Sequence, residues 1–156
     1  QLDRFLMKLS MGYPDVDSQV RILRERSQQE PLEQVEPVMR REELLTAIAK
    51  VRQVHVDDQI YDYIARLAEV TRTHPLLKLG ISPRGALALC RTAKARAFAE
   101  GRDFVVPEDV TQMAEYVFAH RLMLSSKARL NEYTPEAIVA EVLAQTQPPV
   151  LSERRA

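Results

Sequence analysis

Hydrophobic residues recur at helical spacing over most of the chain. Residues 41–53 and the stretch after Asp57 carry apolar side chains three and four positions apart, the spacing of one buried helix face. The first stripe consists of Leu44, Leu45, Ile48 and Val51, and the second of Ile60, Tyr63, Ile64 and Leu67. Both helices are therefore predicted to bury one face against a neighbour.

Capping residues and prolines predict where several helices begin and end. Asp15 is a suitable N-cap for a helix that runs to about Ser27, and Asp57 is suitable for the second of the two striped helices. His74-Pro75 should end that helix, because a residue before proline disfavours helical angles. Residues 28–39 contain two prolines and are expected to form a connector.

The clearest helix signal begins at Ser82-Pro83 and ends before Gly101. Serine is a favoured N-cap, and proline fits the first helical position. One face of this helix carries the small residues Ala86, Cys90, Ala93 and Ala97. Such a face lets a neighbouring helix approach closely, which predicts that this is the central helix of a bundle. Two more helices are expected after Pro107 and Thr134-Pro135, with apolar positions Val110, Met113, Ala114, Val117 and Phe118, then Ile138, Val139, Val142 and Leu143.

The first dozen residues have a different pattern. Phe5, Met7, Leu9 and Met11 alternate with polar residues, although Leu6 interrupts the alternation, and a strand fits better than a helix. Only short strand possibilities follow, around residues 54–56 and 104–106. Because a lone strand leaves its backbone groups unpaired, residues 5–11 should belong to a sheet outside this chain. In this chain the segment is expected to be disordered or to pair with a second copy. The predicted fold class is mainly α, a helical bundle with a short N-terminal strand.

Composition and charge exclude several classes of function. The 22 basic residues balance the 22 acidic ones, so the basic excess of a general nucleic-acid-binding protein is missing. No apolar run approaches the ~20 residues that span a bilayer. A single cysteine, Cys90, excludes an internal disulfide and favours a reducing compartment, so the cytoplasm is the predicted location.

The chain offers no site for independent catalysis. It has no G-x-x-x-x-G-K-[ST] phosphate-binding loop and no acidic strand end for magnesium. His55, His74 and His120 have no metal-ligand spacing with each other or with Cys90, so no metal site is predicted. His120-Arg121 lies at a predicted helix C-terminus, where a cation suits the helix dipole.

Two arginines could contact phosphate. Arg84 stands at the second position of the Ser82 helix, where free backbone N–H groups and a guanidinium fork suit an anion, and Gly85 would let a ligand come close. On these residues alone, an ordinary Ser-Pro helix start whose arginine pairs with a carboxylate is the favoured interpretation. Arg4, just before the predicted strand, could reach a neighbouring molecule's phosphates, yet a solvated arginine is favoured for it too.

The order of several motifs resembles that of MoxR-type AAA+ ATPases. The N-terminal motifs resemble the end of the core domain of that family, and they are Leu2-Asp3-Arg4-Phe5 and Gly12-Tyr13-Pro14. The later motifs resemble the sensor 2 helix of the lid and the helix after it, and they are Ser82-Pro83-Arg84-Gly85-Ala86, Pro107-Glu108-Asp109-Val110 and His120-Arg121-Leu122. Val106 departs from the serine or threonine expected as the cap before Pro107.

The resemblance implies roles for both arginines. Arg84, with Ser82 and Gly85, would be the sensor 2 site that contacts the γ-phosphate of ATP held by the core of its own subunit. Arg4 would be the catalytic arginine finger that reaches the ATP of the adjacent subunit. ATP and magnesium are expected in the full-length protein, and neither is expected to bind this chain alone. The lid would rotate against the core as ATP is hydrolysed.

The resemblance also implies an organisation and a set of partners. Residues 1–14 would end the core, 15–40 would form a linker helix and connector, 41–147 the lid and 148–156 a flexible tail. The chain would be part of a longer ATPase and inactive alone. Its partners would be its own AAA+ core, the neighbouring subunits of a ring, commonly a hexamer, and von Willebrand A-type proteins, in chaperone-like remodelling or metal insertion. The alternative is a free-standing helical protein-interaction module.

Overall fold

The structure is a computed structural model that describes residues 2–26 and 35–150. The chain divides into two compact units, one made of Leu9–Ile48 and the other of Gln1–Lys8 with Ala49–Ala156. In chain order, the elements are η1 (Leu2–Arg4), α1 (Val16–Arg26), α2 (Arg41–Gln53), α3 (Asp58–Thr73), β1 (Leu77–Leu79), α4 (Pro83–Ala99), α5 (Pro107–Phe118), η3 (Ala119–Arg121), β2 (Met123–Leu124), α6 (Ser126–Leu130) and α7 (Pro135–Gln145). None of the described helices has the length and apolar character to cross a membrane.

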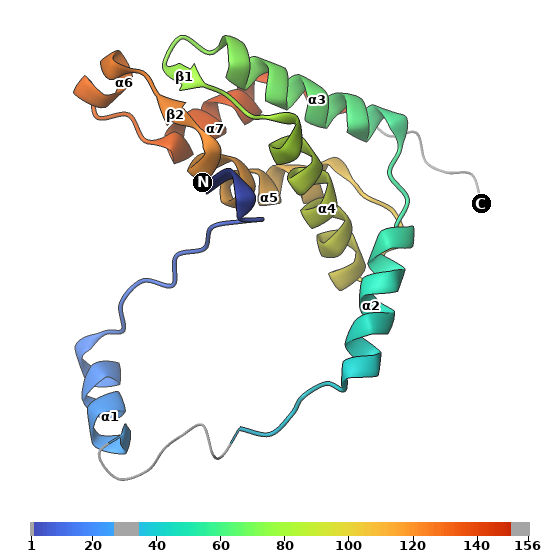
Figure 1. The fold of residues 1–156 in the computed structure, drawn as a ribbon, viewed down its shortest axis with the longest axis vertical. Helices are drawn as coiled ribbons and strands as arrows, with labels where there is room; N and C mark the ends of the chain where they lie inside the picture. Colours follow the sequence, from blue (N-terminus) through green and yellow to red (C-terminus); the bar gives the residue numbers. More distant parts are fainter. Residues whose placement is uncertain (1, 27–34, 151–156) are drawn as a thin grey trace. The chain divides into compact units, whose positions relative to one another are not determined.

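The larger unit is a helical bundle, as predicted. Helix α3 packs on α4 and α7, and α5 packs on α4 and α7, so that four helices enclose one core (Figure 1). The largest fully buried side chains come from all four of these helices and from two of the connecting segments, and they are Tyr63, Phe118, Ile60, Leu67, Ile81, Leu89, Ile138, Val105, Val110, Val117, Val139 and Val142. Helix α4 packs on α3 and α5 with Ala93 and Ala97 of its small-residue face fully buried, whereas Ala86 and Cys90 are only half-buried. Its central place in the bundle stays a prediction.

The predicted helix starts are confirmed by their capping hydrogen bonds. Asp57 accepts from the amide of Gln59 at 2.9 Å, and Thr134 accepts from the amide of Ala137 at 3.1 Å. Val106 stands where a serine or threonine cap was expected before Pro107. There the carboxylate of Asp109 reaches back and accepts from the amide of Val106 at 2.9 Å. The third residue of that helix therefore supplies the acceptor that Val106 lacks.

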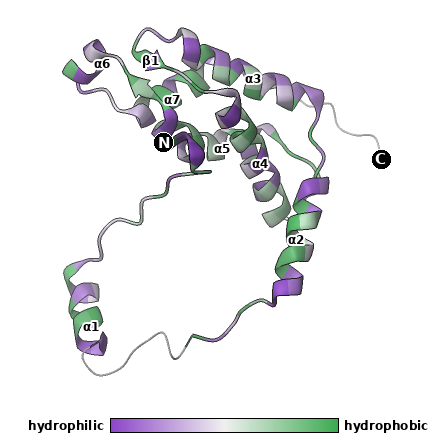
Figure 2. Ribbon diagram, viewed as in Figure 1, coloured by the Kyte–Doolittle hydropathy of each residue, from purple (hydrophilic) through white to green (hydrophobic). Residues whose placement is uncertain are grey.

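Helices α2 and α3, both predicted to bury an apolar stripe, differ in burial. The stripe of α3 is buried as predicted, but the predicted burial of the α2 stripe is wrong, because no residue of α2 is buried. Leu44, Leu45 and Ile48 are 51%, 52% and 44% exposed. The hydrophobic residues of α2 are visible as green segments in Figure 2. In the described part of its unit nothing covers this face. The amphipathic pattern therefore predicted the helix correctly and its burial wrongly.

The linker helix is formed where it was expected. Helix α1 begins after Asp15, whose carboxylate accepts from the amide of Ser18 at 2.7 Å, and it likewise contains no buried residue. The predicted connector at 28–39 is described only from residue 35, and most of the predicted tail, residues 151–156, also lies outside the described residues.

The predicted N-terminal strand is not formed. Residues 2–4 make a 3-10 turn, and the amide of Lys8 donates to the carbonyl of Tyr116 at 2.9 Å, so this segment binds α5 of its own chain. A strand needs a regular ladder with a neighbouring strand, and among the described residues none lies beside it. Its expected disorder or pairing with a second copy is therefore wrong for residues 5–8, which contact the lid.

The sheet that does form is small. Strands β1 and β2 pair antiparallel, and a separate parallel bridge joins His55 to Phe104. That bridge confirms the short pairing segments suspected around residues 54–56 and 104–106. Strand β1 leads into the start of α4, and the contact of β1 with β2 and α3 therefore helps to place that helix start.

A close backbone approach fixes the turn before α4. The hydroxyl of Thr71 accepts from the amide of Ile81 at 2.9 Å, and the Arg72 Nε donates to the carbonyl of Ile81 at 2.9 Å. A Cβ on Gly80 would lie 2.6 Å from the backbone nitrogen of Arg72, so only glycine fits there. The end of α3 thus holds the residues that lead into Ser82.

Candidate functional site

An arginine-rich cleft is the best candidate site in the described part of the chain. Its volume is about 530 Å³, and it is formed by η1, the residues after it, α4 and η3. Its lining contains no acidic residue, and it consists of Arg4, Leu6, Arg84, Leu87, Ala88, Arg91 and Arg121. We call this the arginine cleft.

Arg84 and Arg91 lie seven residues apart on α4, about two helical turns, so that both side chains are on one face. Arg4 reaches the cleft from η1. All three residues are exposed, and their guanidinium groups make no ion pair or hydrogen bond with any described residue. Three uncompensated guanidinium groups around one cavity favour an anionic ligand, and their planar forks suit phosphate oxygens in particular.

Arg121 differs from the other three arginines. Its side chain is 2% exposed, and its Nε lies 3.1 Å from an Asp3 carboxylate oxygen. Burial lowers the pKa of Arg121, and the carboxylate of Asp3 acts in the opposite direction. An arginine stays charged under such conditions, so Arg121 adds positive charge to the cleft wall while Asp3 compensates it.

The predicted site residues Ser82 and Gly85 are engaged within the protein. The hydroxyl of Ser82 accepts from the amide of Gly85 at 3.2 Å and donates to Asp3 at 3.2 Å. Gly85 is buried, and a Cβ there would lie 2.8 Å from Ile81 Cγ2 and 3.0 Å from Arg121 Cδ. The missing side chain therefore leaves room for Arg121 and Ile81.

The structure brings the two predicted arginines together, which the sequence interpretation did not expect, since it assigned Arg84 and Arg4 to different ATP molecules. It also adds Arg91, which the sequence interpretation missed. The available signal was its spacing, since Arg84 and Arg91 share a helix face.

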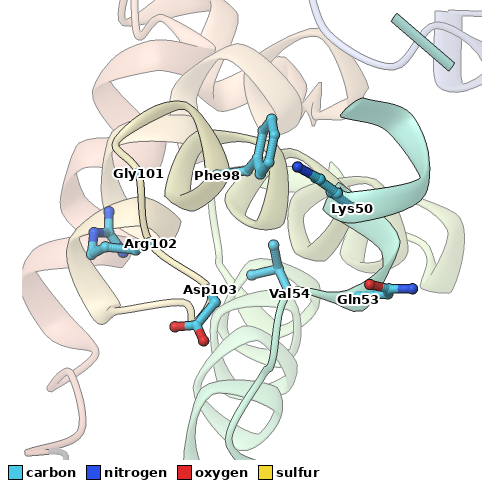
Figure 3. Close-up of a pocket in the computed structure, with 7 residues that line it drawn as sticks. All are labelled: Lys50, Gln53, Val54, Phe98, Gly101, Arg102 and Asp103. Atoms are coloured by element: carbon cyan, nitrogen blue, oxygen red, sulfur yellow. The ribbon is translucent and has the colours of Figure 1, made fainter. Parts of the chain in front are cut away.

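A second cavity, of about 290 Å³, lies where α2 ends and the α4–α5 turn begins (Figure 3). Its lining residues are Lys50, Gln53, Val54, Phe98, Gly101, Arg102 and Asp103. The Arg102 guanidinium is already bound to the buried Asp109 through two contacts of 2.7 and 2.6 Å. In Figure 3 the side chains of Gln53, Arg102 and Asp103 point in different directions, so no group of polar atoms converges on a ligand.

Metal and thiol chemistry find no support in the described residues. No group of three histidine, cysteine or acidic side chains there could hold a metal ion. Burial raises the pKa of the Cys90 thiol, which keeps it protonated and unreactive at neutral pH. Cys90 is therefore a packed side chain, as expected.

Comparison with known proteins identifies the class. Residues 69–142 match the family model described as the AAA lid domain. Protein YeaC of Bacillus subtilis, described as uncharacterized, is 39% identical over 96% of this chain and 47% of its own length. Chaperone MoxR1 of Mycobacterium tuberculosis is 30% identical over 92% of this chain and 40% of its own length.

A solved structure agrees with these relatives. The crystal structure of a candidate ATPase from Cytophaga hutchinsonii superposes with a TM-score of 0.85 and 27% identity, over 96% of this chain and 48% of that chain. The chain thus spans about half the length of the relatives it matches. It contains the lid region of a MoxR-type AAA+ ATPase.

Proposed function

We propose that this lid contributes an arginine cleft that binds the phosphates of ATP during hydrolysis in an oligomeric ring. The observation that carries the proposal is the set of three exposed arginines, Arg4, Arg84 and Arg91, along one cavity without an acidic partner among the described residues. Positive groups fixed around a phosphate chain stabilise the charge that develops during phosphoryl transfer. ATP and its magnesium would be held mainly by a nucleotide-binding core, because no group of three histidine, cysteine or acidic side chains among the lid's described residues could hold a metal ion.

Arg4 and Arg84 act on the same ATP in this proposal. Their shared cleft supports one phosphate group as the target of both. If Arg4 is an arginine finger, that ATP belongs to the neighbouring subunit, and Arg84 then acts across the subunit interface as well. This replaces the sequence-based assignment of Arg84 to the ATP of its own subunit.

Mixing experiments on the full-length protein test this assignment. Arg4→Ala should lower ATP turnover on the order of 10³-fold, the effect of a missing arginine finger. Arg84→Ala should lower it on the order of 10²-fold, as for loss of one transition-state donor. Adding subunits with an inactivated phosphate-binding loop should restore part of the activity of either variant, because those subunits still supply both arginines to a neighbour.

Two outcomes and one control separate the possibilities. Rescue of Arg4→Ala without rescue of Arg84→Ala would return Arg84 to the ATP of its own subunit. Unchanged turnover in both folded variants would contradict the phosphate-binding role. Arg129→Ala is the control, since Arg129 is an exposed arginine that does not line the cleft, and its turnover should be unchanged.

The whole protein's role follows the family in this proposal. A chaperone-like remodelling activity in the cytoplasm is supported by the relative named as a chaperone. Partners with von Willebrand A-type domains, and metal insertion as the output, are proposed on the family resemblance alone. The AAA lid match favours this reading over a free-standing interaction module.

A further inference from the structure

Arg121 is a buried cation that holds the segment around Arg4. Its Nε donates to an Asp3 carboxylate oxygen at 3.1 Å, and its Nη2 donates to the carbonyl of Phe5 at 2.5 Å. The Nη1 atom donates to the carbonyl of Leu6 at 3.2 Å. The guanidinium therefore binds residues on both sides of Arg4 and leaves the side chain of Arg4 itself unbound.

The same guanidinium is anchored in the bundle. Its Nη1 also donates to the carbonyl of Val117 in α5, and η3, which carries Arg121, directly follows that helix. The fixed end of the interaction is thus a packed helix, and the held end is a short 3-10 turn with no buried residue of its own. Apart from Arg121, this segment contacts the lid through the Ser82 to Asp3 hydrogen bond, the contact of His120 Nε2 with the Phe5 carbonyl at 3.3 Å, the Lys8 to Tyr116 hydrogen bond and the packing of Met7 on the core. Arg121 is the one among them that binds backbone carbonyls on both sides of Arg4.

Asp3 extends this network to the start of α4. Its carboxylate accepts from the hydroxyl of Ser82 at 3.2 Å, and Ser82 caps the helix on which Arg84 occupies the second position. The residue before Arg4 and a residue two before Arg84 are therefore joined through one carboxylate. We call Asp3, Ser82 and Arg121 the Arg121 clamp.

Gly85 indicates that α4 is shaped to admit this clamp. A Cβ at position 85 would press on the Arg121 side chain at 3.0 Å and on Ile81 at 2.8 Å. Lysine could not replace the interaction, because its single nitrogen cannot reproduce the planar fork that contacts several carbonyls and a carboxylate at once.

We propose that Arg121 is a positioning residue, and that the Arg121 clamp holds Arg4 in the cleft beside Arg84. This inference rests on the proposed function of the arginine cleft. Arg84 needs no such help, because its backbone belongs to a long helix packed in the core. The clamp should therefore act through Arg4 and leave the contribution of Arg84 intact.

A double-mutant cycle on the full-length protein tests this division. Arg121→Lys should lower ATP turnover on the order of 10²-fold, the effect of misplacing a catalytic group by about 1 Å. Combined with Arg4→Ala it should cause no further loss, whereas combined with Arg84→Ala the two losses should multiply. Multiplying losses for Arg121→Lys and Arg4→Ala would overturn the inference. The control Arg129→Lys should leave turnover unchanged.

Amide hydrogen exchange on this chain gives a readout that does not depend on ATP. Arg121→Lys should speed exchange at Lys8 by at least about tenfold while the amides inside α5 keep their protection. Unchanged exchange at Lys8 would contradict the clamp. If the α5 amides also lose protection, Asp3→Asn takes the place of Arg121→Lys in both tests, because the carboxylate is 44% exposed and its loss spares the core. The same multiplication of losses there would overturn the inference.

The two proposals fail in different ways. If Arg4→Ala and Arg84→Ala leave turnover unchanged, the phosphate role of the cleft is wrong. If both variants lose turnover but the effect of Arg121→Lys is independent of Arg4, the phosphate role remains and only the clamp is wrong.

Discussion

Helices α2 and α3 follow one another in the chain and carry the same kind of apolar stripe, yet α3 buries its stripe and α2 buries no residue. Helix α3 belongs to the unit in which α4 and α7 cover it. Most of α2 belongs to the unit Leu9–Ile48, in which α1 likewise buries nothing. The periodicity of a stripe therefore predicts a helix with one apolar face, and it does not predict that the cover is present in the same chain.

The two units also differ in the burial of their ion pairs. In the packed unit, Asp109 and Arg121 are buried and each is bound to an oppositely charged partner. Among the described residues of the other unit, the ion pair between Arg21 and Glu25 is exposed on both sides and contributes little. Buried charges are costly when unpaired, so the packed unit depends on the partners of Asp109 and Arg121, whereas the exposed Arg21–Glu25 pair matters little.

The largest expected effect is at Asp109. Its carboxylate is 1% exposed, binds the Arg102 guanidinium twice and caps α5. Asp109→Ala should lower the free energy of unfolding by about 3–5 kcal/mol, measured by urea denaturation, because it leaves the guanidinium and the helix start unpaired. The exposed Asp103 supplies the control, and Asp103→Ala should change little. Equal losses at both positions would contradict the anchoring role.

The next effect tests the comparison of the two helices directly. Leu67 on α3 is fully buried, and Leu45 on α2 is 52% exposed. Leu67→Ala should cost about 2–5 kcal/mol of unfolding free energy, whereas Leu45→Ala should stay within about 0.5 kcal/mol. A large loss for Leu45→Ala in this chain would mean that α2 is covered here.

The smallest expected effect is on the pH dependence of stability. All three histidines lie in the packed unit, so this dependence concerns that unit and not Leu9–Ile48. Burial lowers the pKa of His120 below its ordinary value of 6.5, and the neighbouring Arg121 and Lys8 act in the same direction, against hydrogen bonds that the ring makes to the backbone of Phe5 and Tyr116. The unfolded chain therefore binds this proton more tightly than the folded chain does. The corresponding stability is fully present above pH 6.5 and is lost as the pH falls through the lowered pKa.

Urea denaturation between about pH 7 and pH 5 measures this dependence. His120→Gln should make the loss of stability with falling pH smaller. The unsubstituted chain, measured in parallel, is the reference. A steeper loss in His120→Gln would contradict the assignment.

The helices could be predicted because their signals are local. Asp57, Ser82 and Thr134 each cap the helix expected of them, and the α3 pattern identifies its buried face. The N-terminal strand could not be judged in the same way, because a strand depends on a neighbouring strand that alternation alone does not supply. Residues 5–8 bind the lid instead, through Arg121 and Tyr116.

The candidate site was likewise predicted only in part from the sequence. The sequence singled out Arg4 and Arg84 by position and by resemblance, but it could not show that they share a cleft, since 79 residues separate Asp3 from Ser82, which joins their surroundings. Arg121 was expected only as a cation at a helix end. Its contacts with Asp3 and Phe5 depend on packing between distant segments.

By itself, the sequence determined where the longer helices lie, where several of them are capped, and which of their faces are apolar, because these properties arise within a few residues of one another. The short helix α6 and the turn η1 were not predicted. Only the tertiary structure decided which apolar faces are covered, that four arginines line one cavity, and that Gly85 makes room for Arg121. The reason is that burial and the pairing of charges depend on atoms brought together from distant parts of the chain.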